Sequence, residues 1–182
     1  MAHFQQIQEP EDDLQLSTLY REIVDSGFGD AFPLNWFTAQ SSRPDILAAT
    51  WSLVRTMALE GSLPATVKQM IMLSVSIGNK CQYCQVAHSR ALEALDMPLE
   101  LIDNMTTDFK LIKFPPHQRA ILEFARKTAQ EPHAIADEDF QTLRDFGLTN
   151  GEIMEVAMIA AFTNFINTWA DASGIELDPG EQ

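Results

Sequence analysis

The spacing of apolar residues along this chain is helical nearly throughout, and it constrains the fold more than any other feature. In residues 46–60 and 117–130, apolar side chains recur at steps of three and four, which is the period of one helix face. Residues 65–77 are apolar almost all round, as expected of a buried central helix. No segment alternates apolar and polar residues in the manner of a half-buried strand. The pattern therefore predicts an all-α fold.

Turn and capping residues separate this pattern into further segments. We expect additional helices over 81–95, 99–105, 139–146 and 152–172. The Phe-Pro-Pro run at 114–116 is the clearest internal break, because proline cannot continue a helix. Gly147 has the position of a glycine that ends a helix. Thr149 and Glu152 have the spacing of a capping box, so we expect them to open the last helix.

The length of the chain bounds its organisation. A chain of 182 residues of which 46% are hydrophobic can bury a core of its own without disulfides or metals. We predict a flexible N-terminus over residues 1–12, a single all-α domain over 13–178 and a flexible tail over 179–182.

A faint internal similarity predicts a duplicated helical core motif. A shift of 83 residues places Cys81 on Asn164 and Cys84 on Asn167, and most apolar positions of 70–77 fall on apolar positions. If the duplication is real, only the first copy keeps residues capable of redox chemistry.

The charge of the chain excludes several classes of partner. Lys and Arg number 12 and Asp and Glu number 26, so the net charge is −14. This balance argues against nucleic acid, where Lys and Arg neutralise phosphates, and against an anionic membrane surface. No apolar run approaches the roughly 20 residues of a membrane-spanning helix, and the N-terminus lacks the apolar region of a signal peptide. We therefore expect a soluble, cytoplasmic protein.

The two cysteines of the chain, Cys81 and Cys84, are separated by two residues. Two cysteines are too few for a secreted disulfide scaffold, and in a reducing cytoplasm a CxxC pair is more often redox-active or metal-binding. On a helix the two thiols share a face, and His88 lies one further turn along that face. The spacing thus brings two thiols and an imidazole together.

This group has a clear chemical logic. A thiolate is the reactive form of cysteine, and a helix N-terminus, a CxxC partner and an imidazole each favour it. His88 can take the proton of Cys84 and return one to a leaving group. Cys81 can then resolve a sulfenic acid on Cys84 by forming a disulfide, which prevents over-oxidation.

Three other interpretations compete with a redox site. A zinc site needs a fourth ligand, but His117 and His133 lie in other segments, so we expect neither a metal nor another cofactor. A thioredoxin-like fold would place the CxxC after a strand, and the pattern predicts no strand. The third interpretation is structural: two small buried cysteines beside a core histidine.

The segment around the cysteines resembles the core motif of the AhpD-like, carboxymuconolactone decarboxylase superfamily. The residues that carry the resemblance are Asn79, Cys81, Tyr83, Cys84 and His88. The likeness extends over about residues 30–178, and the later part is similar to the peroxidase-related branch. It implies an AhpD-like helical bundle that assembles into homotrimers or homohexamers. It also implies an antioxidant thiol peroxidase or disulfide reductase that acts on organic hydroperoxides and is recycled by a dithiol, thioredoxin-like or lipoyl reductant.

The resemblance also assigns roles to residues. Cys84 matches the peroxidatic cysteine, Cys81 the resolving cysteine and His88 the proton-relay histidine. The relay glutamate of the family lies twelve residues before the first cysteine, and this chain has Gln69 there. An amide orients a proton but does not shuttle one. Members that decarboxylate carboxymuconolactone typically lack the CxxC pair, so we do not expect that activity.

Other polar residues are candidates for supporting the site. Glu152, Glu155 or Asp171 could replace the missing carboxylate, although the capping box is the favoured role of Glu152. We expect Tyr83 to serve in packing, with its hydroxyl as a polar contact.

Asn164 and Asn167 interrupt an apolar helix and need hydrogen-bond partners if they are buried. We favour a structural role for both, and a supporting role beside the cysteines is the alternative.

Three functions follow from these observations. The first is an AhpD-type peroxidase or disulfide oxidoreductase that works through the CxxC pair. The alternative is a family member without peroxidase activity whose CxxC is redox-sensing or structural, because the relay position is Gln69. The third is a scaffold protein with an ordinary helical core.

Overall fold

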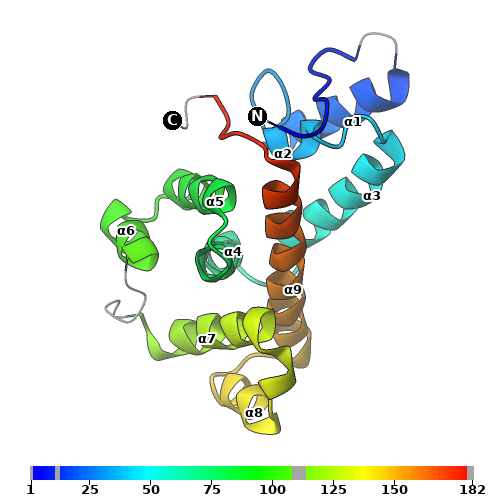
Figure 1. Cartoon of the computed structure of the whole chain (residues 1–182). Helices are drawn as coiled ribbons and strands as arrows, with labels where there is room; N and C mark the ends of the chain where they lie inside the picture. The colour runs from blue at the N-terminus through cyan, green and yellow to red at the C-terminus, as the bar shows by residue number, and fades with distance from the viewer. Residues whose placement is uncertain (1, 11–12, 108–113, 180–182) are drawn as a thin grey trace. The chain divides into compact units, whose positions relative to one another are not determined.

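The computed structural model describes residues 2–10, 13–107 and 114–179. Its helices are α1 (Leu14–Asp25), α2 (Asn35–Thr38), α3 (Pro44–Val54), a π-helical turn (Arg55–Leu59), α4 (Ala65–Asn79), α5 (Gln82–Ala94), α6 (Leu99–Thr107), α7 (Pro116–Gln130), a 3₁₀ turn (Pro132–Ala134), α8 (Asp137–Asp145) and α9 (Asn150–Ser173). Within the described residues no strand forms beyond one isolated bridge, which confirms the all-α prediction (Figure 1).

The described residues group into two compact units, one of residues 1–55 with 169–182 and one of residues 56–168. The single domain and the flexible ends predicted from sequence stay predictions. The first unit contains α1 to α3, of which the sequence pattern predicts only α3. The apolar residues of α1 that are buried, Leu16, Tyr20 and Ile23, nevertheless have helical spacing.

Aromatic side chains form the core of the first unit. The rings of Phe28 and Trp51 meet edge to face with centroids 5.5 Å apart, and those of Trp36 and Phe37 do so at 5.1 Å. Such T-shaped contacts are the favoured geometry of aromatic pairs. The segment after α9 is tied to the rest of this unit at Asp178, whose carboxylate oxygen accepts a hydrogen bond from the backbone N–H of Asn35 at 2.6 Å.

The second unit is built around α4. Its apolar residues Ile71, Leu73 and Val75 have no exposed surface, which confirms the predicted buried central helix. Helix α4 packs against α5 and α7, α6 packs against α5, and α8 packs against α7. Figure 1 shows α4 between α5 and α7. A helix surrounded in this way needs apolar residues on nearly every face, which is the pattern its sequence shows.

Helices α4 and α5 form a hairpin with a very short turn. Helix α4 ends at Asn79, and Lys80 takes a left-handed conformation with φ of 61°. Cys81 is then the N-cap residue of α5. The two halves of the predicted duplication therefore differ at this point, because α9 runs on as one continuous helix where α4 and α5 are broken. The duplication itself stays a prediction.

Two helix ends form as the sequence predicts. The hydroxyl of Thr149 accepts a hydrogen bond from the Glu152 N–H, and the Glu152 carboxylate accepts one at 2.7 Å from the Thr149 N–H. This confirms the capping box. Gly147 follows α8 with φ of 90°, a conformation that favours glycine. The predicted helix over 46–60 differs, because α3 ends at Val54 and the next five residues form a π-helical turn.

None of the helices described is long and apolar enough to cross a membrane.

Candidate thiol site

Two buried thiols lie at the start of α5. Cys81 and Cys84 have 0% and 1% of their surface exposed, and both are thiols rather than halves of a disulfide. The backbone of Cys81 is held on both sides: its N–H donates to the Ser76 carbonyl and its own carbonyl accepts from the Gln85 N–H, each at 3.1 Å. Cys84 follows in the first turn of α5. The N-terminus of a helix favours negative charge, which suits chemistry that passes through a thiolate.

His88 lies one turn after Cys84 on α5 and is oriented by Gln69 of α4. The Nδ1 atom of His88 is 2.8 Å from the Gln69 Oε1 atom. An amide oxygen only accepts hydrogen bonds, so Nδ1 carries the proton and Nε2 keeps its lone pair. Burial lowers the pKa of His88 to about 4. The imidazole is therefore neutral at neutral pH and presents Nε2 as a base.

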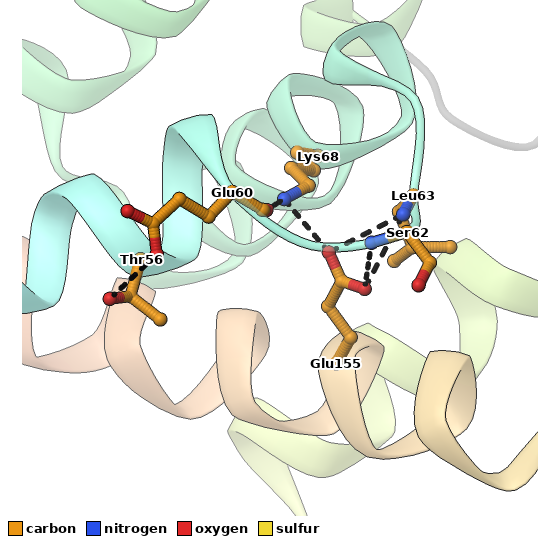
Figure 2. Close-up of polar contacts among 6 residues, drawn as sticks. All are labelled: Thr56, Glu60, Ser62, Leu63, Lys68 and Glu155. Atoms are coloured by element: carbon orange, nitrogen blue, oxygen red, sulfur yellow. Dashed lines mark hydrogen bonds and ion pairs between the residues drawn. The ribbon is translucent and has the colours of Figure 1, made fainter.

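Glu155, a candidate replacement for the missing relay carboxylate, is engaged elsewhere. Its Oε1 atom is 2.8 Å from the Lys68 Nζ atom, and its Oε2 atom accepts from the Ser62 N–H at 2.9 Å. Burial alone would raise the pKa of Glu155, but the hydrogen bonds from Lys68 and Ser62 outweigh it and hold that pKa below its usual value. Figure 2 shows the carboxylate between Lys68 and the backbone of Ser62 and Leu63.

The other two candidate carboxylates also have other places. Glu152 forms the capping box with Thr149. Asp171 is exposed and belongs to the first unit. Among the described residues, the side chain hydrogen-bonded to His88 is therefore the amide of Gln69.

Lys68 is a buried charge that the spacing of the apolar residues does not predict. It has 2% of its side chain exposed, lies directly before Gln69, and donates to the Glu60 carbonyl as well as to Glu155 (Figure 2). A lysine in a helix that is apolar almost all round is a signal for such a pair, because a buried charge needs a partner. The position of that partner on α9 is not visible in the local sequence.

Three asparagines join α9 to the turn that carries Cys81. The Nδ2 atom of Asn79 donates to the Oδ1 atoms of Asn164 and Asn167, at 2.7 and 2.8 Å. Asn167 in turn donates to the Ser76 hydroxyl at 3.0 Å. The predicted need of Asn164 and Asn167 for hydrogen-bond partners is thus met.

Tyr83, between the cysteines, has 6% of its surface exposed, so its ring is packed in the interior. In the part of the chain that the structure describes, no three His, Cys, Asp or Glu side chains lie close enough together to hold a metal ion. His117 and His133 are exposed, and each lies on a segment other than the hairpin.

The predicted residues therefore fall into two groups. In the hairpin of α4 and α5, Gln69 is hydrogen-bonded to His88, and Cys81 and Cys84 lie at the start of the helix that carries His88. Asn164 and Asn167 of α9 bind Asn79, directly before the turn of this hairpin. The site is a buried dithiol with a neutral histidine, set in a helical fold.

Residues 44–105 match the model of the carboxymuconolactone decarboxylase family. This match and the likeness to a structure with an AhpD core support the resemblance of the chain to the AhpD-like, carboxymuconolactone decarboxylase superfamily. No curated protein sequence matches the chain.

Solved structures of several proteins share the fold. A peroxidase-related protein with an alkylhydroperoxidase AhpD core from Ralstonia eutropha is 28% identical, with a TM-score of 0.83 over 91% of this chain and 87% of that one. A peroxidase-related protein from Silicibacter is 23% identical, with a TM-score of 0.84 over 98% and 96%. The debrominase Bmp8, solved with 2,3,4-tribromopyrrole, is 20% identical, with a TM-score of 0.82 over 100% and 96%. Proteins of this fold thus differ in their chemistry.

Proposed function

We propose that this protein is a thiol-dependent oxidoreductase that reduces organic hydroperoxides through Cys81 and Cys84. The observation that supports this most is the buried dithiol at the start of α5, with the neutral imidazole of His88 one turn away. A pair of reduced thiols beside a base is sufficient for a two-electron peroxidase cycle. The likeness to peroxidase-related structures supports the same reaction.

The cycle would begin at Cys84. His88 Nε2 accepts the thiol proton, the Cys84 sulfur attacks the outer peroxide oxygen, and the O–O bond breaks. The sulfur is oxidised to a sulfenic acid, and the departing alkoxide takes the proton from His88 to leave as an alcohol. The Cys81 thiol then attacks the sulfenic sulfur, which releases water and forms the Cys81–Cys84 disulfide.

A dithiol donor would restore the pair by thiol–disulfide exchange, becoming a disulfide itself. We propose a thioredoxin-like or lipoyl reductant and a reducing compartment such as the cytoplasm, where the pair is kept as thiols. A small substrate suits the site, since both sulfurs are buried. The cycle uses the sulfurs and the imidazole of the chain and needs no further cofactor.

We also propose that the protein is a homotrimer or homohexamer, as its resemblance to the superfamily implies. Met154, Met158 and Phe165 are exposed along α9, which supports contact with further copies of the chain. A monomeric mass in sedimentation equilibrium would overturn this part of the proposal.

A second candidate is a redox sensor without peroxidase turnover. The observation that favours it is Gln69, because a histidine held by an amide has no carboxylate to stabilise its protonated form. Such a protein would form the Cys81–Cys84 disulfide reversibly but consume hydroperoxide negligibly.

Serine variants of the two cysteines test the proposed enzyme. We expect Cys84→Ser to abolish the consumption of cumene hydroperoxide in an assay driven by a dithiol, because the attacking sulfur is lost. Cys81→Ser should permit a single turnover and then stall, with sulfinic acid accumulating on Cys84 in mass spectra. Equal, undiminished turnover by both variants would contradict the proposal, and reversible disulfide formation without turnover in the parent would favour the sensor.

A further inference from the structure

Next to the turn between α4 and α5 lies a network of polar side chains that the proposed cycle does not use. It consists of Asn79, Asn164, Asn167 and Ser76, and we call it the asparagine network. Ser76 and Asn167 are buried, with 0% and 2% of their surface exposed. The network joins the last turn of α4 to α9. Of its members, Asn79 and Ser76 lie close to Cys81 in sequence, whereas Asn164 and Asn167 belong to α9.

The direction of every hydrogen bond in the network is determined from its outer ends. The Ser76 hydroxyl donates to the Met72 carbonyl at 2.7 Å, so its oxygen must accept from Asn167 Nδ2. Asn164 Nδ2 donates at 2.8 Å to the Ala129 carbonyl, which can only accept. Both asparagines of α9 therefore turn their oxygens inward, and only a donor such as the Asn79 amide can satisfy the two together.

The network acts on the residue that would resolve the sulfenic acid. Ser76 belongs to the network through its hydroxyl, and its carbonyl accepts the hydrogen bond from the Cys81 N–H. Asn79 comes two residues before Cys81, and only the left-handed Lys80 lies between them. A shift of this turn would move the Cys81 sulfur relative to Cys84, which the first turn of α5 holds in place.

The geometry points to Asn79 as a positioning residue that holds Cys81 ready to form its disulfide with Cys84. The inference rests on the proposed redox role of the CxxC pair. Holding two reacting groups in a near-attack arrangement raises their effective concentration, and a shift of about 1 Å can cost up to about 100-fold. Loss of the two Asn79 hydrogen bonds should therefore weaken disulfide formation even where the fold is intact.

The test measures the effective concentration of the two thiols in a glutathione redox buffer. In this exchange oxidised glutathione takes two electrons from the pair, giving the Cys81–Cys84 disulfide and two molecules of reduced glutathione. The substitution Asn79→Asp keeps the shape of the side chain but removes the donor. Gln82→Glu is its matched control. Gln82 is exposed and lies on the other side of Cys81, and the substitution adds the same negative charge there.

We expect Asn79→Asp to lower the effective concentration about tenfold and Gln82→Glu to leave it within about twofold of the parent. A value for Asn79→Asp within twofold of the control would overturn the inference. Circular dichroism establishes that each variant is folded. The equilibrium does not depend on hydroperoxide turnover, so failure of the proposed peroxidase activity would be seen separately, in the parent protein.

A second pair of variants keeps the inference testable if Asn79→Asp does not fold. Ser76→Ala removes the hydroxyl that Asn167 binds, and Ser74→Ala removes a buried hydroxyl on the same helix that finds no hydrogen-bond partner among the described residues. We expect only Ser76→Ala to lower the effective concentration, by a few-fold. Equal values for the two serine variants would contradict the inference.

Discussion

At the scale of single residues, Gln69 fixes which ring nitrogen of His88 carries the proton, and burial sets the pKa of the ring. The Gln69 oxygen holds Nδ1 in its protonated state but brings no charge, so burial dominates and lowers the pKa of His88 to about 4. A base with so low a pKa takes the Cys84 proton inefficiently, because the best catalytic pKa lies near the working pH. In the proposed cycle, His88 would therefore be oriented by Gln69 but would be a weak base.

The substitution Gln69→Glu should make His88 a stronger base. A carboxylate facing Nδ1–H stabilises the imidazolium, so the pKa of His88 should rise well above the parent value of about 4, and peroxidase turnover should rise with it. Titration of the histidine by NMR measures the first effect and a hydroperoxide assay the second. Gln82→Glu supplies the same charge at an exposed position and should change neither. Turnover that does not rise although the pKa does would show that Gln69 is not what limits the cycle.

At the scale of elements, the Lys68–Glu155 pair joins the start of α4, the loop before it and α9. The carboxylate satisfies the backbone N–H groups of Ser62 and Leu63 as well as the lysine (Figure 2). Lysine is rarely buried so completely, and its ammonium group is acceptable there because two oxygens accept from it. The pair therefore decides where the loop over 60–63 meets α9.

Removing one partner of this pair should destabilise the fold strongly. We expect Lys68→Met to lower the free energy of unfolding by about 3 kcal/mol, because the Glu155 carboxylate is left partly buried without its cation. The double variant Lys68→Met with Glu155→Leu should regain part of the loss. Urea denaturation measures both, and Arg43→Ala, which breaks an exposed ion pair with Asp45, is the control expected to change little. A loss no larger than that of the control would contradict the buried pair.

At the scale of the whole molecule, the partly buried, neutral His88 makes stability depend on pH. Its pKa is about 4 in the folded protein and 6.5 as the ordinary value, so between these pH values the unfolded chain binds a proton that the folded chain does not. Stability therefore falls as the pH is lowered from 6.5 to about 4. The contribution is fully present above pH 6.5.

The variant His88→Gln isolates this contribution. The free energy of unfolding of the parent should fall relative to that of the variant by up to about 3 kcal/mol as the pH goes from 7 to 4. Denaturation at a series of pH values measures the difference, in which the titration of the many carboxylates common to both proteins cancels. Parallel curves for parent and variant would show that His88 is not held neutral by burial.

The predictability of the structure changes with the distance between the interacting residues. The helices α4, α5 and α7 and the face shared by Cys84 and His88 follow from spacings of three and four residues. The capping box of Thr149 and Glu152 is equally local. Leu16, Tyr20 and Ile23 of helix α1 have the same spacing, but polar residues dominate the rest of that segment, so the pattern does not predict α1.

The contacts that complete the site are of another kind. Asn79 and Asn164 are 85 residues apart in sequence, and their hydrogen bond depends on how α4 and α9 pack. The ion pair of Lys68 with Glu155 depends on the same packing. An isolated asparagine or lysine in an apolar helix signals only that a partner is needed, and cannot show which residue provides it.

The sequence by itself determined the helical class, the chemical identity of the dithiol and the face that Cys84 shares with His88, because helix geometry is a property of near neighbours along the chain. Only the tertiary structure decided that Glu155 forms an ion pair with Lys68 and that the amide of Gln69 is hydrogen-bonded to His88. It also decided that Asn164 and Asn167 are hydrogen-bonded to Asn79, before the turn that leads to Cys81. Those choices belong to the packing of helices, where burial removes water and each polar group must find its partner within the protein.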